Sequence, residues 1–120
     1  MSSFAEADLN RFLAEDPGGP VVMLNLLRFR PDGGRERYME YAARSIPIAE
    51  RFGAEALYVG DGDRALVAEA GQAWDAVVLM RYPSRQAFAS MVRDPEYRAG
   101  AHLRSEALTE SVLQPTVAFA

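Results

Sequence analysis

The stretch VVMLNLLRF, Val21–Phe29, is the strongest indication of the fold in this sequence. Its aliphatic side chains are typical of a β-strand, and apolar residues occupy both odd and even positions along it. The stretch AVVLM, Ala76–Met80, has the same two-sided pattern. A strand with one solvated face alternates apolar and polar residues, so both stretches are predicted to have two covered faces. A second copy of the chain is the most economical cover for the second face, and the pattern leaves open which face points inward.

The segments around these strands have recognisable helix and strand patterns. A short helix over Phe4–Leu13 is expected, ended by EDPGGP. The other expected elements are helices over about Gly34–Phe52 and PSRQAFASMV (83–92), a helix from Asp94 and Pro95 to about Thr109, a hairpin of EALYVG (55–60) and RALVAEA (64–70), and a last strand SVLQPTVAF (111–119).

This order of elements predicts an α+β fold. A strand, a helix, a hairpin, a strand, a helix and a strand in succession match a ferredoxin-like split βαβ unit with a four-stranded antiparallel sheet and helices on one face. The hairpin is expected to add an extra β-hairpin strand. The 120 residues are expected to form a single domain, 1–120, with residues 1–18 as an N-terminal helical extension.

Composition limits the chemistry that this chain can carry. The net charge is −4 and all 13 basic residues are arginines scattered along the chain, which argues against a nucleic-acid or anionic membrane surface. The absence of cysteine and lysine removes thiolate and Schiff-base chemistry. No apolar run approaches the roughly 18 residues of a membrane span, and no leader pattern precedes the first helix. We therefore expect a cytoplasmic protein with no cofactor, no metal and no membrane partner.

Three segments resemble a known family. RYMEYAARSIPIAERFGA, WDAVVLMRYPSRQAF and DPEYRAGAHLRSEALTESVL are similar to domain-of-unknown-function family number 1330, within the dimeric α/β-barrel superfamily. The likeness covers about Val21–Pro115, and the N-terminal helix departs from the family's usual short start. The resemblance implies a homodimer whose two sheets close face to face into a dimeric α/β barrel. Relatives in the superfamily include cofactor-free monooxygenases, lactone isomerases, haem enzymes and ligand sensors, so the fold alone does not choose a function.

His102 and Arg104 lie on the same predicted helix but on different sides of it. Counting about 100° per residue from Tyr97 places His102 near 140°, on a charged face, and Arg104 near 340°, within an apolar arc. We therefore expect His102 to be exposed and to bind neither metal nor haem. Arg104 needs a buried partner, and a carboxylate is favoured over an anionic ligand. The candidate carboxylates are Asp75, Glu69 and Asp94.

Four residues are candidate ligand-binding groups, and no catalytic residue is identified. Asn25 interrupts an apolar strand, Arg81 and Tyr82 end another, and Arg104 is the fourth. Asp61 and Asp63, in the stretch GDGD, are interpreted as a turn, because a twelve-residue calcium loop with its terminal glutamate is absent.

These observations support more than one function. The first hypothesis is a homodimeric barrel that acts as a cofactor-free enzyme, monooxygenase-like or isomerase-like, on a small, partly apolar, anionic molecule. The alternatives are a non-catalytic module that binds or senses such a molecule, and a structural or interaction module with a filled barrel. An enzyme needs a titrating group with a shifted pKa in a cavity, a binding module needs a cavity and an anion site, and a structural module needs neither.

Overall fold

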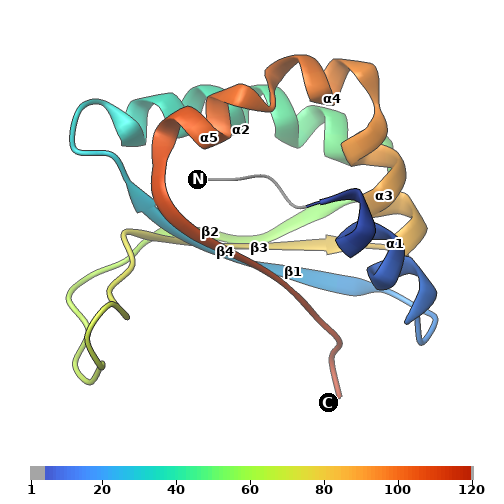
Figure 1. The fold of residues 1–120 in the computed structure, drawn as a ribbon, viewed down its shortest axis with the longest axis horizontal. Coiled ribbons are helices and arrows are strands. Elements are labelled where there is room, and N and C mark those ends of the chain that lie inside the picture. Colours follow the sequence, from blue (N-terminus) through green and yellow to red (C-terminus); the bar gives the residue numbers. More distant parts are fainter. Residues whose placement is uncertain (1–4, 120) are drawn as a thin grey trace.

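The chain folds into a four-stranded antiparallel sheet with helices packed on one face (Figure 1). The computed structural model describes residues 5–119. The elements are α1 (Glu6–Ala14), β1 (Val21–Phe29), α2 (Gly34–Arg51), β2 (Glu55–Asp61), β3 (Ala76–Tyr82), α3 (Arg85–Arg93), α4 (Pro95–Gly100), α5 (His102–Ala107) and β4 (Leu108–Thr116). The strand order is β2-β3-β1-β4. This arrangement confirms the ferredoxin-like split βαβ fold.

The two faces of the sheet are covered differently. In β1 the residues Val21, Met23 and Leu27 are buried against the helices, whereas their neighbours Val22 and Leu26 are only half-buried. Strand β3 follows the same alternation, and the register Asn25↔Val78 places these two residues on the helix face. The apolar residues at both parities of β1 therefore serve two faces, and only one of them is covered within the chain.

Capping groups fix where the helices on this face begin. The hydroxyl of Ser84 accepts a hydrogen bond from the amide of Ala87 at 3.0 Å and starts α3. The carboxylate of Asp94 accepts from the amides of Glu96 and Tyr97 and starts α4, with Pro95 as its first residue. The expected helix start at Asp94 and Pro95 is confirmed.

Two expected elements differ in the structure. The extra hairpin strand over residues 64–70 is wrong, because this segment forms no strand and β2 pairs directly with β3. Just after this segment, the carbonyls of Gly71 and Ala73 accept hydrogen bonds from the Arg28 side chain and not from a neighbouring strand. The last helix is interrupted at Ala101 and ends at Ala107, so β4 begins at Leu108 and not at Ser111.

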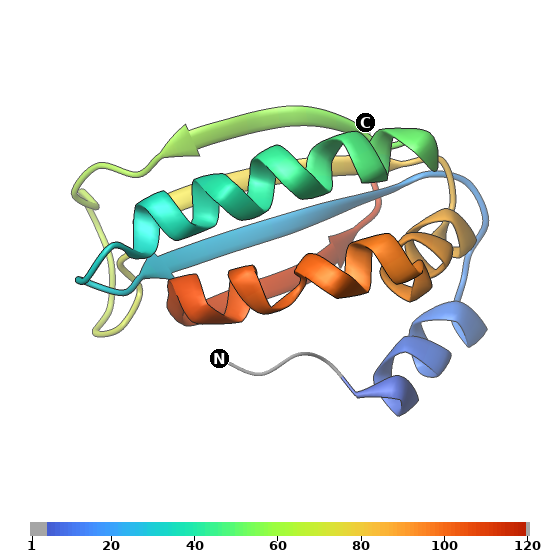
Figure 2. The same cartoon turned by 90° about the horizontal axis from the view of Figure 1, so that it is seen from above.

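Helix α1 packs at the side of the main helical layer, against α3 (Figure 2). The ring of Phe12 meets the edge of Phe88 with centroids 5.7 Å apart. The guanidinium of Arg85 lies over the Phe12 ring and donates to the Phe12 carbonyl at 2.8 Å. Phe4, where the helix was expected to begin, lies outside the described residues. Within residues 5–119 no helix combines the length and apolar character needed to cross a bilayer.

Candidate functional site

A cavity of about 1480 Å³ lies between the sheet and the helices. Figure 2 shows α2 and the α4–α5 segment side by side above the sheet, and residues from all of these elements line the cavity. Most of the wall is apolar or aromatic. The polar side chains on it include those of Asn25, Tyr38, Tyr41, Ser45, Tyr82, Tyr97 and Arg104.

Arg104 and Asn25 meet across this cavity. Arg104 comes from α5 and donates a hydrogen bond from Nη2 to Asn25 Oδ1 of β1 at 3.2 Å. Asn25 is only 8% exposed, so its amide is a buried polar group on the sheet. A buried amide is stable only when it is hydrogen-bonded, and the arginine supplies one such bond. The two side chains therefore form one polar patch on an apolar wall.

A pair of phenols lies next to this patch. The hydroxyls of Tyr41 on α2 and Tyr97 on α4 are 2.7 Å apart, and either one can be the donor. Tyr97 takes this position because the Asp94 cap fixes the first turn of α4. The DPEY motif thus starts a helix and also places a hydroxyl in the cavity wall.

Burial favours the neutral form of three phenols of the cavity, those of Tyr38, Tyr82 and Tyr97. Burial raises the pKa of Tyr38 to about 12, and the nearby Arg104 offsets a small part of this rise. Burial also raises the pKa values of Tyr82 and Tyr97, and the Tyr41 phenol adds to both. A neutral phenol keeps its O–H and can donate a hydrogen bond to an anion. The site therefore combines a permanent cation with hydroxyl donors.

Three of the four candidate ligand-binding residues come together at this cavity. Asn25, Tyr82 and Arg104 line it. Arg81 lies on the opposite face of the sheet, because it alternates with Tyr82 along β3, and it pairs with Glu55 at 3.6 Å. His102 is exposed, as expected, and stands among the residues at the cavity wall.

None of the three carboxylates expected as partners pairs with Arg104. Asp75 accepts a hydrogen bond from the amide of Phe29, and Asp94 caps α4. Glu69 is exposed in the segment between β2 and β3. The sequence does not predict the hydrogen bond from Arg104 to Asn25, because the two residues lie 79 positions apart on different elements.

The sequence also does not predict that the hydroxyls of Tyr41 and Tyr97 form a hydrogen bond. Tyr38, Tyr41 and Ser45 recur at helical spacing, so the pattern correctly placed them on one face of the helix over residues 34–52. That spacing equally describes ordinary core packing. The only signal for a site was that this inner face carries hydroxyl groups, which a purely structural core has little use for.

The GDGD stretch is not the turn that was expected, because Asp61 is still the last residue of β2. Asp61 forms an ion pair with Arg35 at 2.8 Å, and this guanidinium lowers the pKa of the Asp61 carboxyl. Among residues 5–119, no three or more His, Cys, Asp or Glu side chains gather in a way that could hold a metal ion.

Comparisons with known proteins agree with the fold. The family model described as Domain of unknown function (DUF1330) matches residues 33–114. A structure of a protein of unknown function from Rhodopseudomonas palustris is 34% identical over 95% of this chain and 93% of that chain, with a TM-score of 0.87. No curated protein matches the chain significantly.

More distant structures share the fold alone. A dimeric protein of unknown function with a ferredoxin-like fold from Bacteroides fragilis is 12% identical, with a TM-score of 0.58 over 81% of this chain and 94% of that one. A dimeric ferredoxin-like protein of unknown function from Thermobifida fusca is 14% identical, with a TM-score of 0.58 over 85% and 93%. The family model spans most of the chain, and it includes the tyrosines of α2 and α4 and the arginine of α5. The chain therefore belongs to the DUF1330 family and has its ferredoxin-like fold.

Proposed function

We propose that this protein binds a small, partly apolar anion in the cavity between the sheet and the helices. The observation that carries the proposal is the convergence of Arg104, Asn25 and the phenols of Tyr38 and Tyr97 on one largely apolar wall. An apolar cavity with a few convergent polar groups is the usual form of a small-molecule site. The apolar wall would hold the body of the ligand and the polar patch its anionic group.

The electrostatics of the patch favour an anion over a neutral ligand. Arginine keeps its charge at any pH that a protein tolerates, and its planar donors match a carboxylate. The phenols of Tyr38 and Tyr97 are neutral at pH 7, as any ordinary tyrosine is, and burial moves both pKa values further up, so they add donors without adding negative charge. A carboxylate or an enolate is the class of group that fits.

The test is a comparison of a charged and a neutral probe on three proteins. We expect 2-naphthoate to bind the wild type more tightly than 2-naphthalenemethanol, which has a similar body and no charge. Arg104→Met should weaken naphthoate binding at least tenfold and remove the preference for the charged probe. Arg81→Met is the matched control, because Arg81 lies on the other face of the sheet. Equal binding of both probes to all three proteins would sink the proposal.

We further propose that the protein is a homodimer that pairs through the open face of the sheet. Val22, Leu24, Leu26, Val77, Leu79 and Val112 share this face and remain half-buried in the single chain. Contiguous apolar surface of this kind is typical of a protein–protein interface. Structures of the same fold are described as dimeric. Light scattering with size exclusion should give about twice 13.2 kDa, and a monomer at micromolar concentration would contradict the proposal.

A second candidate function is catalysis without a cofactor at the same site. Neutral phenols and a guanidinium can stabilise a developing oxyanion, and His102 at the cavity wall is a candidate base. A cofactor-free isomerase or monooxygenase would begin by removing a proton from a carbon acid. Exchange of that proton for deuterium in a bound β-keto acid, followed by NMR, tests this step. Exchange no faster with the wild type than without protein would leave binding as the function, and equally fast catalysed exchange with His102→Ala would exclude His102 as the base.

A further inference from the structure

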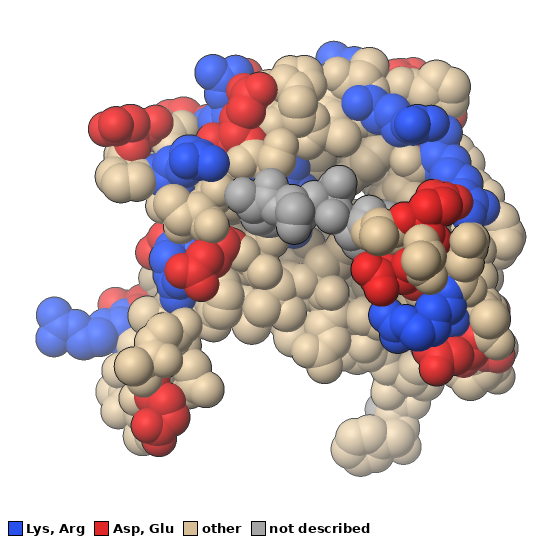
Figure 3. Space-filling view, viewed as in Figure 1, with Lys and Arg blue, Asp and Glu red and all other residues tan. Residues whose placement is uncertain are grey.

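Two parts of the chain project beyond the open face of the sheet. The segment 62–75, which joins β2 to β3 and is called the arm below, and the C-terminal residues 117–119 both extend away from the helices (Figure 1). They stand at opposite ends of the sheet. Figure 3 shows them as two protrusions with a hollowed, mostly uncharged surface between them.

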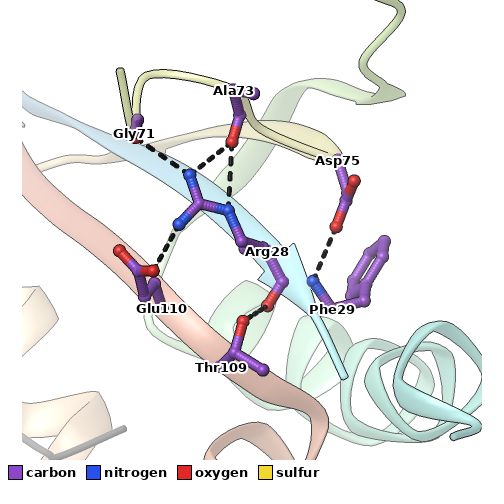
Figure 4. A network of polar contacts seen from close by, with 7 residues as sticks. All are labelled: Arg28, Phe29, Gly71, Ala73, Asp75, Thr109 and Glu110. Carbon is purple, nitrogen blue, oxygen red and sulfur yellow. Dashed lines mark hydrogen bonds and ion pairs between the residues drawn. The ribbon is translucent and has the colours of Figure 1, made fainter. Parts of the chain in front are cut away.

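The arm is held firmly at its base by Arg28 (Figure 4). Arg28 donates to the carbonyls of Gly71 at 2.9 Å and Ala73 at 2.6 Å, and forms an ion pair with Glu110 of β4. Its guanidinium also lies 4.7 Å from the centre of the Trp74 ring. One side chain of β1 thus ties the arm to two strands of the sheet.

Backbone groups close the base of the arm as well. The amide of Asp75 donates to the carbonyl of Leu27 at 2.8 Å. The Asp75 carboxylate accepts from the amide of Phe29 at 2.9 Å (Figure 4). The amide of Gly62 donates to the Asp75 carbonyl at 2.8 Å and joins the two ends of the arm. Because the arm is anchored at several points, its orientation is fixed, and it projects beyond the open face of the sheet.

The tip of the arm carries two aliphatic side chains, between the charged Arg64 and Glu69, that nothing in the described chain covers. Leu66 is 101% exposed and Val67 is 95% exposed. A loop that only needs to connect two strands is usually polar at its tip, because water solvates it. An anchored base with two fully exposed aliphatic side chains at the tip is the arrangement expected of a preformed contact element.

We infer that the arm clasps a second copy of this chain, with Leu66 and Val67 buried against it. The inference rests on the homodimer proposed above and adds a contact outside the sheet faces. The second copy is the occupant that the geometry favours, since the arm and the apolar sheet face project to the same side. In a two-fold pair of sheets each copy presents the same surface, so each arm reaches the other chain. Phe119, 102% exposed at the opposite end of the face, would be covered in the same assembly.

The absence of cysteine allows a direct test. Leu66→Cys labelled with an environment-sensitive fluorophore such as acrylodan should show a blue-shifted emission at concentrations where the protein is dimeric, and lose the shift on dilution to monomer. Met39→Cys on α2, exposed at 41% on the helical side, is the matched control and should show no dependence on concentration. A label at Leu66 that stays solvated in a protein shown to be dimeric would overturn the arm contact and leave the dimer intact.

A second variant separates the two proposals by affinity. Leu66→Asp should raise the dimer dissociation constant at least tenfold in analytical ultracentrifugation, whereas Met39→Asp should leave it unchanged. Circular dichroism checks that both variants are folded. A monomeric wild type would overturn the homodimer and the arm together, and an unchanged constant for Leu66→Asp would overturn the arm alone. A blue shift seen only with added lipid vesicles would assign the tip to a membrane surface, against the inference.

Discussion

Both faces of the sheet carry apolar and polar side chains, but only one face is covered within the chain. The face under the helices buries Val21, Met23 and Leu27 together with Asn25. The open face carries Val22, Leu24 and Leu26 along the same strand, and these stay half-buried beside charged residues such as Arg81. Apolar character alone therefore does not distinguish the covered face from the open one.

The two faces of the sheet meet different structural requirements. On the helix face, polar groups are tolerated because they bond to one another, as Arg104 and Asn25 do at 3.2 Å. On the open face, apolar side chains are tolerated because the proposed second copy removes them from water. The functions proposed above assign a small-molecule site to the first face and a protein interface to the second. The predictions below change residues on each of these two sides.

The largest effect is expected for neighbouring leucines of β1. Leu27, which is 0% exposed, faces the helices, and Leu27→Ala should lower the free energy of unfolding by about 2 to 5 kcal/mol at every protein concentration. Leu26→Ala removes the same atoms from the open face, so its cost should be smaller in dilute protein and grow with protein concentration. Urea unfolding at two concentrations measures both. A cost for Leu26→Ala that ignores concentration would contradict pairing through this face.

Alkaline pH should destabilise the helix face through its phenols. The pKa of Tyr38 is raised to about 12, so below about pH 10 this phenol is neutral in both the folded and unfolded states. As the pH rises from 10 towards 12, only the unfolded state ionises, so the free energy of unfolding falls, by about 3 kcal/mol for a shift of about two pH units. Thermal melts with tyrosinate absorbance should show this loss, and Tyr38→Phe should reduce it. A melting temperature unchanged up to pH 12 would contradict the burial of this phenol.

A smaller effect is expected at the base of the arm on the open face. Arg28→Ala removes the hydrogen bonds to Gly71 and Ala73 and the ion pair to Glu110, at a cost of about 1 to 3 kcal/mol. Arg64 lies within the arm and is a trypsin site, so its cleavage should become faster once the arm is released. Arg30→Ala, at an exposed residue nearby, is the control. Equal cleavage rates at Arg64 in both variants would show that Arg28 does not hold the arm.

The smallest effect is expected for the histidine. His102 is exposed on α5, and His102→Ala should change the free energy of unfolding by no more than about 0.5 kcal/mol. Thermal or urea denaturation measures the change. A loss above 1 kcal/mol, or the appearance of a bound metal or haem that depends on His102, would mean that another group covers this side of the helix.

Part of the site was predictable because helical periodicity is local. The count along the last helix predicts an inward Arg104 and an exposed His102. Arg104 is half-buried and bonds to Asn25, and His102 is exposed, although both line the cavity. The same reasoning failed beyond Ala107, where the helix gives way to β4 at Leu108 and does not continue to about Thr109. The alternative strand, with Leu108 buried at 0% exposure beside β1, is stabilised by pairing with distant residues. Local propensity does not report such pairing.

The fold class was predictable from the sequence, because its signals are local. These signals are the apolar patterns of Val21–Phe29 and Ala76–Met80 and the helix caps at Ser84 and Asp94, each of which involves only a few neighbouring residues. The sequence also determined that the strands have two apolar faces. The tertiary structure was needed to show which face the helices cover, that Arg104 binds Asn25 and none of the three candidate carboxylates, and that residues 64–70 are not part of the sheet. The side-chain alternation along a strand assigns residues to two faces but does not show which face is buried. Which face is buried depends on side chains far apart in the chain, which meet only when the helices pack on the sheet.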